Sequence, residues 1–339
     1  MTGVGRATAV PVVDLRHTSG QLRSSLREAA HEVGFFYLLG HGVPQALARR
    51  VLDAARKLFA LPQVDKDAVA MVHSPHFRGY TRLGGELTRG EVDWREQIDI
   101  GPERPSIGGP EKPDYLWLQG PNQWPAGLPE LPGIVDEWDA ALSSVARTLL
   151  RHWAASLGSP PDAFEAAFAE TPATLIKIIR YPARASSPQG VGAHRDAGVL
   201  TLLLAEPGSA GLQVRRARGR DDGWIDVPPL EGAFIVNIGE LLEVATGGYL
   251  RATEHRVSLR GAAAERISVP FFFNPRLDAQ IPVLSLPADL AARTDARWSP
   301  SADPSDPIFA VYGRNAWKSR LRAHPDVADA HGYSSSRVG

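Results

Sequence analysis

The sequence predicts a mixed α/β fold with a mainly β core, a double-stranded β-helix (jelly roll) with helices packed around it. Two observations carry this prediction. Residues 174–283 hold short apolar segments separated by turn residues, beginning with a plain strand pattern at 174–182. Residues 45–60 and 132–157 instead repeat apolar side chains at helical spacing. We therefore expect a β core flanked by helices.

The first third of the chain alternates strands and helices. The expected elements are, in order, a strand at 10–15, a helix at 19–33, a strand at 35–39 and a helix at 45–60. Gly34 ends the first helix, and Pro62 ends the second because proline cannot continue a helix. Residues 72–125 are rich in glycine, proline and aromatic residues. They predict an irregular region of the kind that often shapes a binding site.

A long helix at 132–157 has one apolar face and leads, through a shorter helix at 162–169, into the β core. No internal repeat and no linker-like composition divides the chain, so we predict a single domain over residues 1–339. Its expected parts are an N-terminal region with a substrate-pocket loop at 10–125, a metal-binding core at 174–283 and a C-terminal tail at 284–339 as a candidate lid.

Composition excludes several classes of protein. The chain has no cysteine, which excludes disulfides, thiolate metal sites and cysteine nucleophiles. Its formal net charge is −1 at pH 7, and its basic residues are spread out, so no nucleic-acid partner is expected. No apolar leader or long apolar run is present. We therefore expect a cytoplasmic protein without a membrane partner, either a monomer or a weak homo-oligomer.

A candidate metal centre begins with His194 and Asp196. Residues two apart on an extended strand point to the same face, so these side chains can converge while Arg195 points away. A second histidine, His255, follows several strand and turn segments and is expected to return beside the first pair. Two imidazoles and one carboxylate form the facial triad of non-haem Fe(II) oxygenases, which leaves positions open for other ligands.

A candidate anion site lies eleven residues further along, at Arg266 and Ser268. Both belong to an apolar strand pattern, and an arginine facing inward from such a strand is costly unless it meets an anion. The planar guanidinium suits a carboxylate, and the Ser268 hydroxyl can add a donor on the same face. An internal salt bridge to a buried carboxylate is the alternative, and the motif alone leaves it open.

Together these motifs resemble the isopenicillin N synthase-like branch of the 2-oxoglutarate- and Fe(II)-dependent oxygenases, and the similarity covers nearly the whole chain. The shared pattern is a His-x-Asp pair, a distal His-Arg-Val and an Arg-x-Ser. The resemblance implies that Fe(II) is bound by His194, Asp196 and His255. It implies that the cosubstrate 2-oxoglutarate is bound by Arg266, Ser268 and Tyr181.

The resemblance also suggests a substrate pocket, and it shows one departure. Residues 77–80 match an FRGY segment that the family places near the active site. The candidate substrate contacts are Phe77, Arg78, Tyr80 and Phe271, with a purely structural role for the loop as the alternative. Many relatives have asparagine where this chain has Ile179, so the sequence does not reveal how the proximal end of 2-oxoglutarate is held.

The implied function is an oxidoreductase that uses Fe(II), 2-oxoglutarate and O2 to hydroxylate, desaturate or cyclise a small molecule, with release of succinate and CO2. A role in secondary metabolism is expected from the bacterial relatives. Asp196 argues against halogenation, because halogenating relatives lack this carboxylate. Two alternatives remain open: an Fe(II)/O2 oxidase that does not use 2-oxoglutarate, and a non-catalytic binding protein on the same fold. A zinc hydrolase is disfavoured because no His-Glu-x-x-His helix is present, and a nucleic-acid demethylase because no basic groove is indicated.

Overall fold

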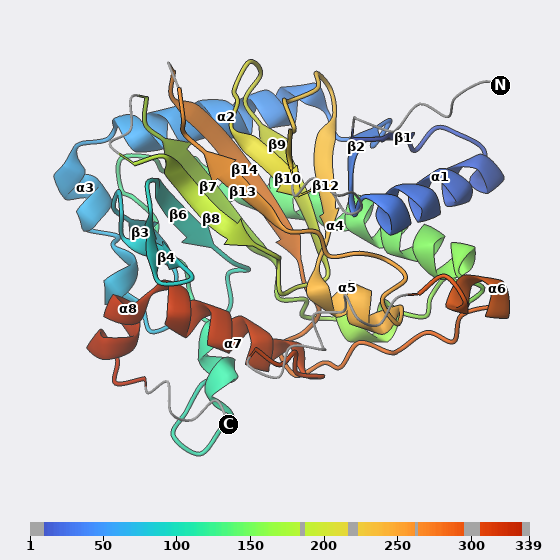
Figure 1. Ribbon diagram of the computed structural model, residues 1–339. Helices are drawn as coiled ribbons and strands as arrows, with labels where there is room; N and C mark the ends of the chain where they lie inside the picture. The colour runs from blue at the N-terminus through green and yellow to red at the C-terminus, as the bar shows by residue number, and fades with distance from the viewer. Residues whose placement is uncertain (1–9, 184–186, 216–222, 262–263, 295–305, 334–339) are drawn as a thin grey trace.

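The computed structural model describes residues 10–183, 187–215, 223–261, 264–294 and 306–333. It confirms the predicted β core with helices packed around it (Figure 1). The larger sheet consists, in spatial order, of β1 (Val12–Asp14), β2 (Phe35–Leu39), β12 (Phe234–Ile238), β9 (Leu200–Ala205), β14 (Arg266–Phe273), β7 (Leu175–Tyr181), β6 (Glu96–Ile100) and β3 (Gly79–Thr81). The smaller sheet consists of β11 (Trp224–Asp226), β10 (Leu212–Arg215), β13 (His255–Ser258) and β8 (Gln189–His194).

The two sheets pack face to face through a small apolar layer. This layer takes side chains from both of them: from the larger sheet Phe35, Ile179, Tyr181 and Ile235, and from the smaller one Val191, Leu212, Val214 and Val257. Every named pair of neighbouring strands is antiparallel except β1 and β2, which are parallel. Such sheet-on-sheet packing is the architecture expected for a jelly roll.

Three helices supply the main hydrophobic core on the outer face of the larger sheet. They are α1 (Ser19–Glu32), α2 (Gln45–Ala60) and α4 (Leu131–Ser156). α4 buries Trp138 and Trp153 along one face and packs against α1, α2, β9 and β14. These three helices match their predicted ranges within one or two residues. The helix predicted at 162–169 is only a short 3₁₀ turn, Glu165–Phe168.

The remaining helices lie at the ends of the sheets. They are α3 (Gln63–Asp67), α5 (Glu240–Ala245), α6 (Ala288–Ala291), α7 (Tyr312–Ala323) and α8 (Pro325–Ala330). α7 and α8 lie below the β core in the view of Figure 1. Among the described residues, no helix combines the length and the apolar character that a bilayer crossing requires.

Strand β14 separates the core from the interior of the β-helix. Its side chains alternate, as in any extended strand. Ile267, Val269, Phe271 and Phe273 enter the hydrophobic core beneath the helices. Arg266, Ser268, Pro270 and Phe272 instead line a cavity between the sheets. The alternation therefore determines which residues of this strand can reach a bound ligand.

The region predicted as irregular contains a hairpin that helps to form the cavity. Its strands are β4 (Glu86–Thr88) and β5 (Glu91–Asp93), and Thr88 pairs with Glu91 across a two-residue turn. The turn residues Arg89 and Gly90 both have positive φ, 53° and 81°, as a type I′ turn requires. The prediction of an irregular region was thus wrong here, because Arg-Gly is a weaker hairpin signal than Asn-Gly or Asp-Gly.

Candidate metal centre

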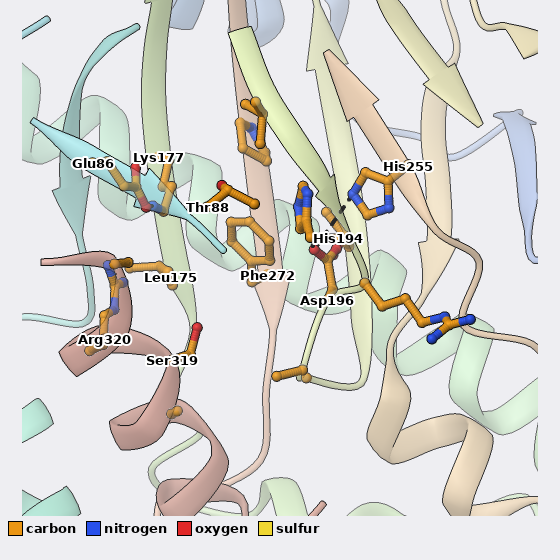
Figure 2. Close-up of a pocket in the computed structure, with 18 of the residues that line it drawn as sticks. Glu86, Thr88, Leu175, Lys177, His194, Asp196, His255, Phe272, Ser319 and Arg320 are labelled. Atoms are coloured by element: carbon orange, nitrogen blue, oxygen red, sulfur yellow. Dashed lines mark hydrogen bonds and ion pairs between the residues drawn. The ribbon is translucent and has the colours of Figure 1, made fainter. Parts of the chain in front are cut away.

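Three side chains converge where β8 and β13 pair. The two strands are antiparallel, and His255 lies opposite His194. Asp196 follows two residues after His194, just past the end of β8. Its Oδ1 is 3.6 Å from the Nε2 atom of each histidine, and one ligand atom from each residue lies within 4.8 Å of the others. Figure 2 shows the three side chains gathered at one side of the cavity.

Backbone carbonyls determine which nitrogen of each imidazole faces this centre. Nδ1 of His194 is 2.8 Å from the carbonyl oxygen of Gly192, and Nδ1 of His255 is 3.1 Å from that of Thr253. Because a carbonyl oxygen only accepts hydrogen bonds, each Nδ1 carries the proton. Each Nε2 therefore keeps a free lone pair that points toward Asp196.

The carboxylate of Asp196 is oriented in a similar way. Its Oδ2 accepts hydrogen bonds from the hydroxyl of Thr201 at 2.5 Å and from the side-chain amide of Asn237 at 2.8 Å. Oδ1 remains toward the two histidines. Three acceptor atoms thus face one another with no proton between them, an arrangement that needs a cation. The hydrogen bonds behind them are those that orient metal ligands in proteins.

The charges of the three groups also fit a divalent metal. Burial and the neighbouring His255 lower the pKa of His194 to about 4, so this imidazole is neutral near neutral pH. Burial alone would raise the pKa of Asp196, but the two histidines and the hydrogen bonds from Thr201 and Asn237 lower it below its usual value. A neutral imidazole and an ionised carboxylate are the forms that bind metals.

Arg266 lies on the larger sheet, across from β8 and β13. It pairs in register with Tyr181 of β7, and its guanidinium lies over the Tyr181 ring, 4.8 Å from the ring centre. Its Nη1 donates to the Ser268 hydroxyl at 3.1 Å. Arg266 is buried, and no carboxylate among the described residues forms an ion pair with it. The salt bridge that the sequence left open is therefore absent from this part of the chain.

Both groups open into one cavity of about 760 Å³. The metal-centre residues lie at one side of it, together with Arg266, Ser268 and Tyr181. Further walls come from the β4–β5 hairpin, from β7 and from α7. The volume is in the range of pockets that bind small organic molecules.

Comparison with known proteins agrees with this geometry. The family model for the non-haem dioxygenase in morphine synthesis N-terminal region matches residues 10–127, and that of the 2OG-Fe(II) oxygenase superfamily matches residues 173–275. The 2-oxoglutarate-dependent dioxygenase frbJ of Dothideomycetidae sp. (strain 11243) is 32% identical over 341 residues, covering 95% of this chain and 91% of that protein. The chain belongs to the 2-oxoglutarate- and Fe(II)-dependent oxygenases.

Two further comparisons agree with this family membership. A homoarginine-6-hydroxylase of Glycine max is 35% identical over 266 residues, covering 76% of this chain and 78% of that protein. The crystal structure of JOX2 in complex with 2OG, Fe and JA superposes with a TM-score of 0.69 at 26% identity, covering 95% of this chain and 88% of that one. The oxygenase is an enzyme that uses Fe(II), 2-oxoglutarate and O2, as the sequence predicted.

The structure places only one of the four expected substrate contacts in the cavity. Arg78 lines it, whereas Phe77 and Tyr80 are buried outside its lining. Phe77 packs against Trp317 of α7. The Tyr80 hydroxyl donates to Glu96 at 2.5 Å. We therefore correct the expectation for these two aromatic residues, which attach their loop to the core.

The expectation for Phe271 is corrected for a different reason. Phe271 is fully buried in the core beneath the helices. It is an odd number of positions from Arg266 on β14, so it points to the opposite face of the sheet. Its neighbour Phe272 lines the cavity instead.

Sequence reasoning missed a buried network of ion pairs in the oxygenase's cavity wall. Glu86 of β4 pairs with Lys177 of β7 at 2.7 Å and with Arg95 at 2.8 Å. Asp99 of β6 pairs with the same lysine at 3.3 Å and with Arg320 of α7 at 2.5 Å. Lys177 lies two and four residues before Ile179 and Tyr181 on the same strand, so all three side chains share one face. This spacing could have shown that Lys177 faces inward. The partners come from distant parts of the sequence and carried no local signal.

Below the metal centre, α5 holds a carboxyl group with an unusual pKa. Glu243 is buried, its Oε2 accepts a hydrogen bond from the backbone N–H of Ala252, and burial raises its pKa to about 7. The folded state therefore binds a proton that the unfolded state releases above a pKa of about 4.5. Stability due to this group is present at low pH and is lost as the pH rises through about 7.

We expect the Glu243→Gln oxygenase to resist this loss, because glutamine does not ionise. The free energy of unfolding of the variant minus that of the wild type should be about 1–3 kcal/mol larger at about pH 8 than at about pH 5. Urea unfolding at the two pH values measures the difference. The exposed Glu231→Gln serves as the control. A stability difference independent of pH would show that Glu243 does not titrate in this window.

Proposed function

We propose that Fe(II) is bound by His194, Asp196 and His255, and that the distal carboxylate of 2-oxoglutarate is bound by Arg266 with Ser268 and Tyr181. One observation supports this assignment above all others. A single cavity holds three free acceptor atoms that need a cation and, on the facing sheet, a buried guanidinium that needs an anion. A divalent metal and a dicarboxylate meet both needs.

Within this assignment the protein orients the reactants and excludes water. Bound Fe(II), together with 2-oxoglutarate and O2, supplies the oxidising power to break an unactivated C–H bond, with succinate and CO2 as coproducts. Thr201 and Asn237 hold the carboxylate of Asp196. Apolar side chains such as Phe35 and Leu203 line the cavity and limit the access of water. Ile179 also lines it, and it cannot supply the hydrogen bond that asparagine offers in many relatives.

The proposed substrate is a small molecule that is hydroxylated, desaturated or cyclised, in a role in secondary metabolism. The cavity volume supports a small substrate. We further propose that the oxygenase works in the cytoplasm as a monomer or weak homo-oligomer and does not act on nucleic acids. Several relatives are named homoarginine-6-hydroxylases, so L-homoarginine is the first compound to test.

The test measures succinate and CO2 released from 2-oxoglutarate by the full-length protein. We expect release that requires both Fe(II) and O2 and that fails with Zn(II) in place of Fe(II). A true substrate should raise the rate above the basal level and should gain one oxygen atom or lose two hydrogen atoms by mass spectrometry. Oxidation of a substrate with no 2-oxo acid present would contradict the proposal.

A further inference from the structure

The buried cations that line the cavity fall into two groups. Four of them have carboxylate partners, and one of these, Lys318, pairs with Asp306 at 2.6 Å. Arg95 pairs with Glu86 and with Asp93, at 2.8 and 3.2 Å. Lys177 and Arg320 take part in the same buried network. Among the described residues, two buried arginines of the cavity have no ion-pair partner: Arg78 and Arg266. The proposed function accounts for Arg266 through 2-oxoglutarate, but it leaves Arg78 unexplained.

Arg78 lacks most of the contacts that a buried guanidinium normally makes. Arg78 immediately precedes β3 and is only 8% exposed. Its Nη2 donates to the carbonyl oxygen of Leu118 at 3.0 Å. Its Nε is buried and has no hydrogen-bond partner. A guanidinium has five N–H groups and is expected to meet acceptors for most of them when it is buried. The cavity is the space in which a further acceptor could lie.

The surroundings fix the position of this side chain. A Cβ on Gly101 would lie 2.1 Å from Nη2 of Arg78, so only glycine leaves room for the guanidinium there. Burial and the nearby charge of Arg320 lower the pKa of Arg78 to about 10. Arg78 is therefore still a cation at neutral pH. The charge of Arg320 is already neutralised by Asp99, so the positive charge in excess in this wall belongs to Arg78.

We propose that Arg78 binds a carboxylate of the organic substrate, so that the oxygenase acts on small carboxylic acids. This inference rests on the proposed function, since it concerns the substrate of the same cavity. A carboxylate matches the planar donor pattern of a guanidinium. In the view of Figure 2, Leu175 and Phe272 lie between Arg320 and the metal centre. Both apolar side chains line the same cavity as Arg78, so the apolar part of the substrate, between its carboxylate and the oxidised carbon, would lie against them.

A direct test observes Arg78 in the full-length protein loaded with Zn(II) and saturated with 2-oxoglutarate, which occupies Arg266. The probes are hexanoate and its neutral counterpart hexanamide. The NMR signal of the Arg78 Nε–H group is first assigned in the wild type. Hexanoate should shift this signal, and hexanamide should not. No shift with hexanoate at tens of millimolar, or equal shifts with both probes, would overturn the proposal. This measurement does not depend on turnover, so its result can be read even if the protein converts no 2-oxoglutarate.

A second test uses the turnover assay with matched acids and amides, beginning with L-homoarginine and L-homoargininamide. In the wild type the acid should have a KM at least about tenfold lower than the amide. Arg78→Gln should remove this preference by raising the KM of the acid, while the KM of the amide changes far less. The control is Arg322→Gln, since Arg322 lines the same cavity but is exposed and paired with Asp306.

The outcomes separate the two proposals. If the wild type shows no basal conversion of 2-oxoglutarate, the proposed function is refuted, while the NMR result still stands. An acid preference that survives in Arg78→Gln would overturn the inference about Arg78 alone. Arg78→Lys is the second variant if the glutamine variant does not fold, and it should retain part of the preference because it keeps the charge without the planar fork.

Discussion

Asp196→Ala is expected to abolish substrate oxidation and to weaken Fe(II) binding by at least about a hundredfold, because it removes the only charged ligand of the proposed centre. The structure gives the physical reason. The Oδ1 atom lies 3.6 Å from both imidazole nitrogens, so it is the one group that neutralises part of the metal charge at this point. Neutral histidines alone form a weaker site for a hard divalent cation.

Iron stoichiometry after anaerobic reconstitution and succinate release measure the two effects of this change. Asp226→Ala is a suitable control, because Asp226 is an exposed carboxylate on β11 that accepts a hydrogen bond from the Gln213 side chain. Full iron loading together with normal turnover in Asp196→Ala would show that the metal lies elsewhere.

Arg266→Ala is expected to raise the KM for 2-oxoglutarate by roughly thirtyfold to several thousandfold. Breaking a buried charge pair costs about 2–5 kcal/mol, and this range is the same cost expressed as an affinity ratio. Arg266 is buried, and its polar contacts among the described residues are with the neutral side chains of Ser268 and Tyr181. The dicarboxylate would therefore supply its only full negative charge.

Titration of succinate release against 2-oxoglutarate measures this effect, and the Fe(II) affinity should change little. A 2-oxo acid without the second carboxylate should lose far less, because it never contacts the arginine. Arg266→Lys should recover part of the loss, because lysine restores the charge without the planar pair of donors. An unchanged KM in Arg266→Ala would place the distal carboxylate elsewhere in the cavity.

The clustering of His194, Asp196 and His255 could be predicted from local spacing. The spacing of His194 and Asp196 predicts side chains on one face, which holds although Asp196 lies just past the end of β8. The return of His255 needs only an antiparallel pairing. The same rule of alternation was available for β14. With Arg266 and Ser268 facing inward, Phe272 and not Phe271 had to reach the cavity, so that error came from the rule being applied to only part of the strand.

Other features could not be predicted, because their signals are not local. The pair Asp99–Arg320 joins residues 221 positions apart, and nothing near either residue indicates the other. This pair attaches α7 to β6, so the C-terminal segment forms a fixed wall of the cavity at this point. A lid role for the tail as a whole stays a prediction. The burial of Phe77 depends on its contact with Trp317 of the same helix, and it was hidden for the same reason.

The most direct test of the central claim is the anaerobic addition of Fe(II) and then 2-oxoglutarate to the full-length protein, followed by visible absorption. A 2-oxo acid chelated to Fe(II) gives a weak charge-transfer band. We expect the band in the wild type only when both are present, no band in Asp196→Ala, and a band in Arg266→Ala only at much higher 2-oxoglutarate concentration. A band of full intensity in Asp196→Ala, or its absence from the iron-loaded wild type, would contradict the assignment of His194, Asp196 and His255 as the Fe(II) site.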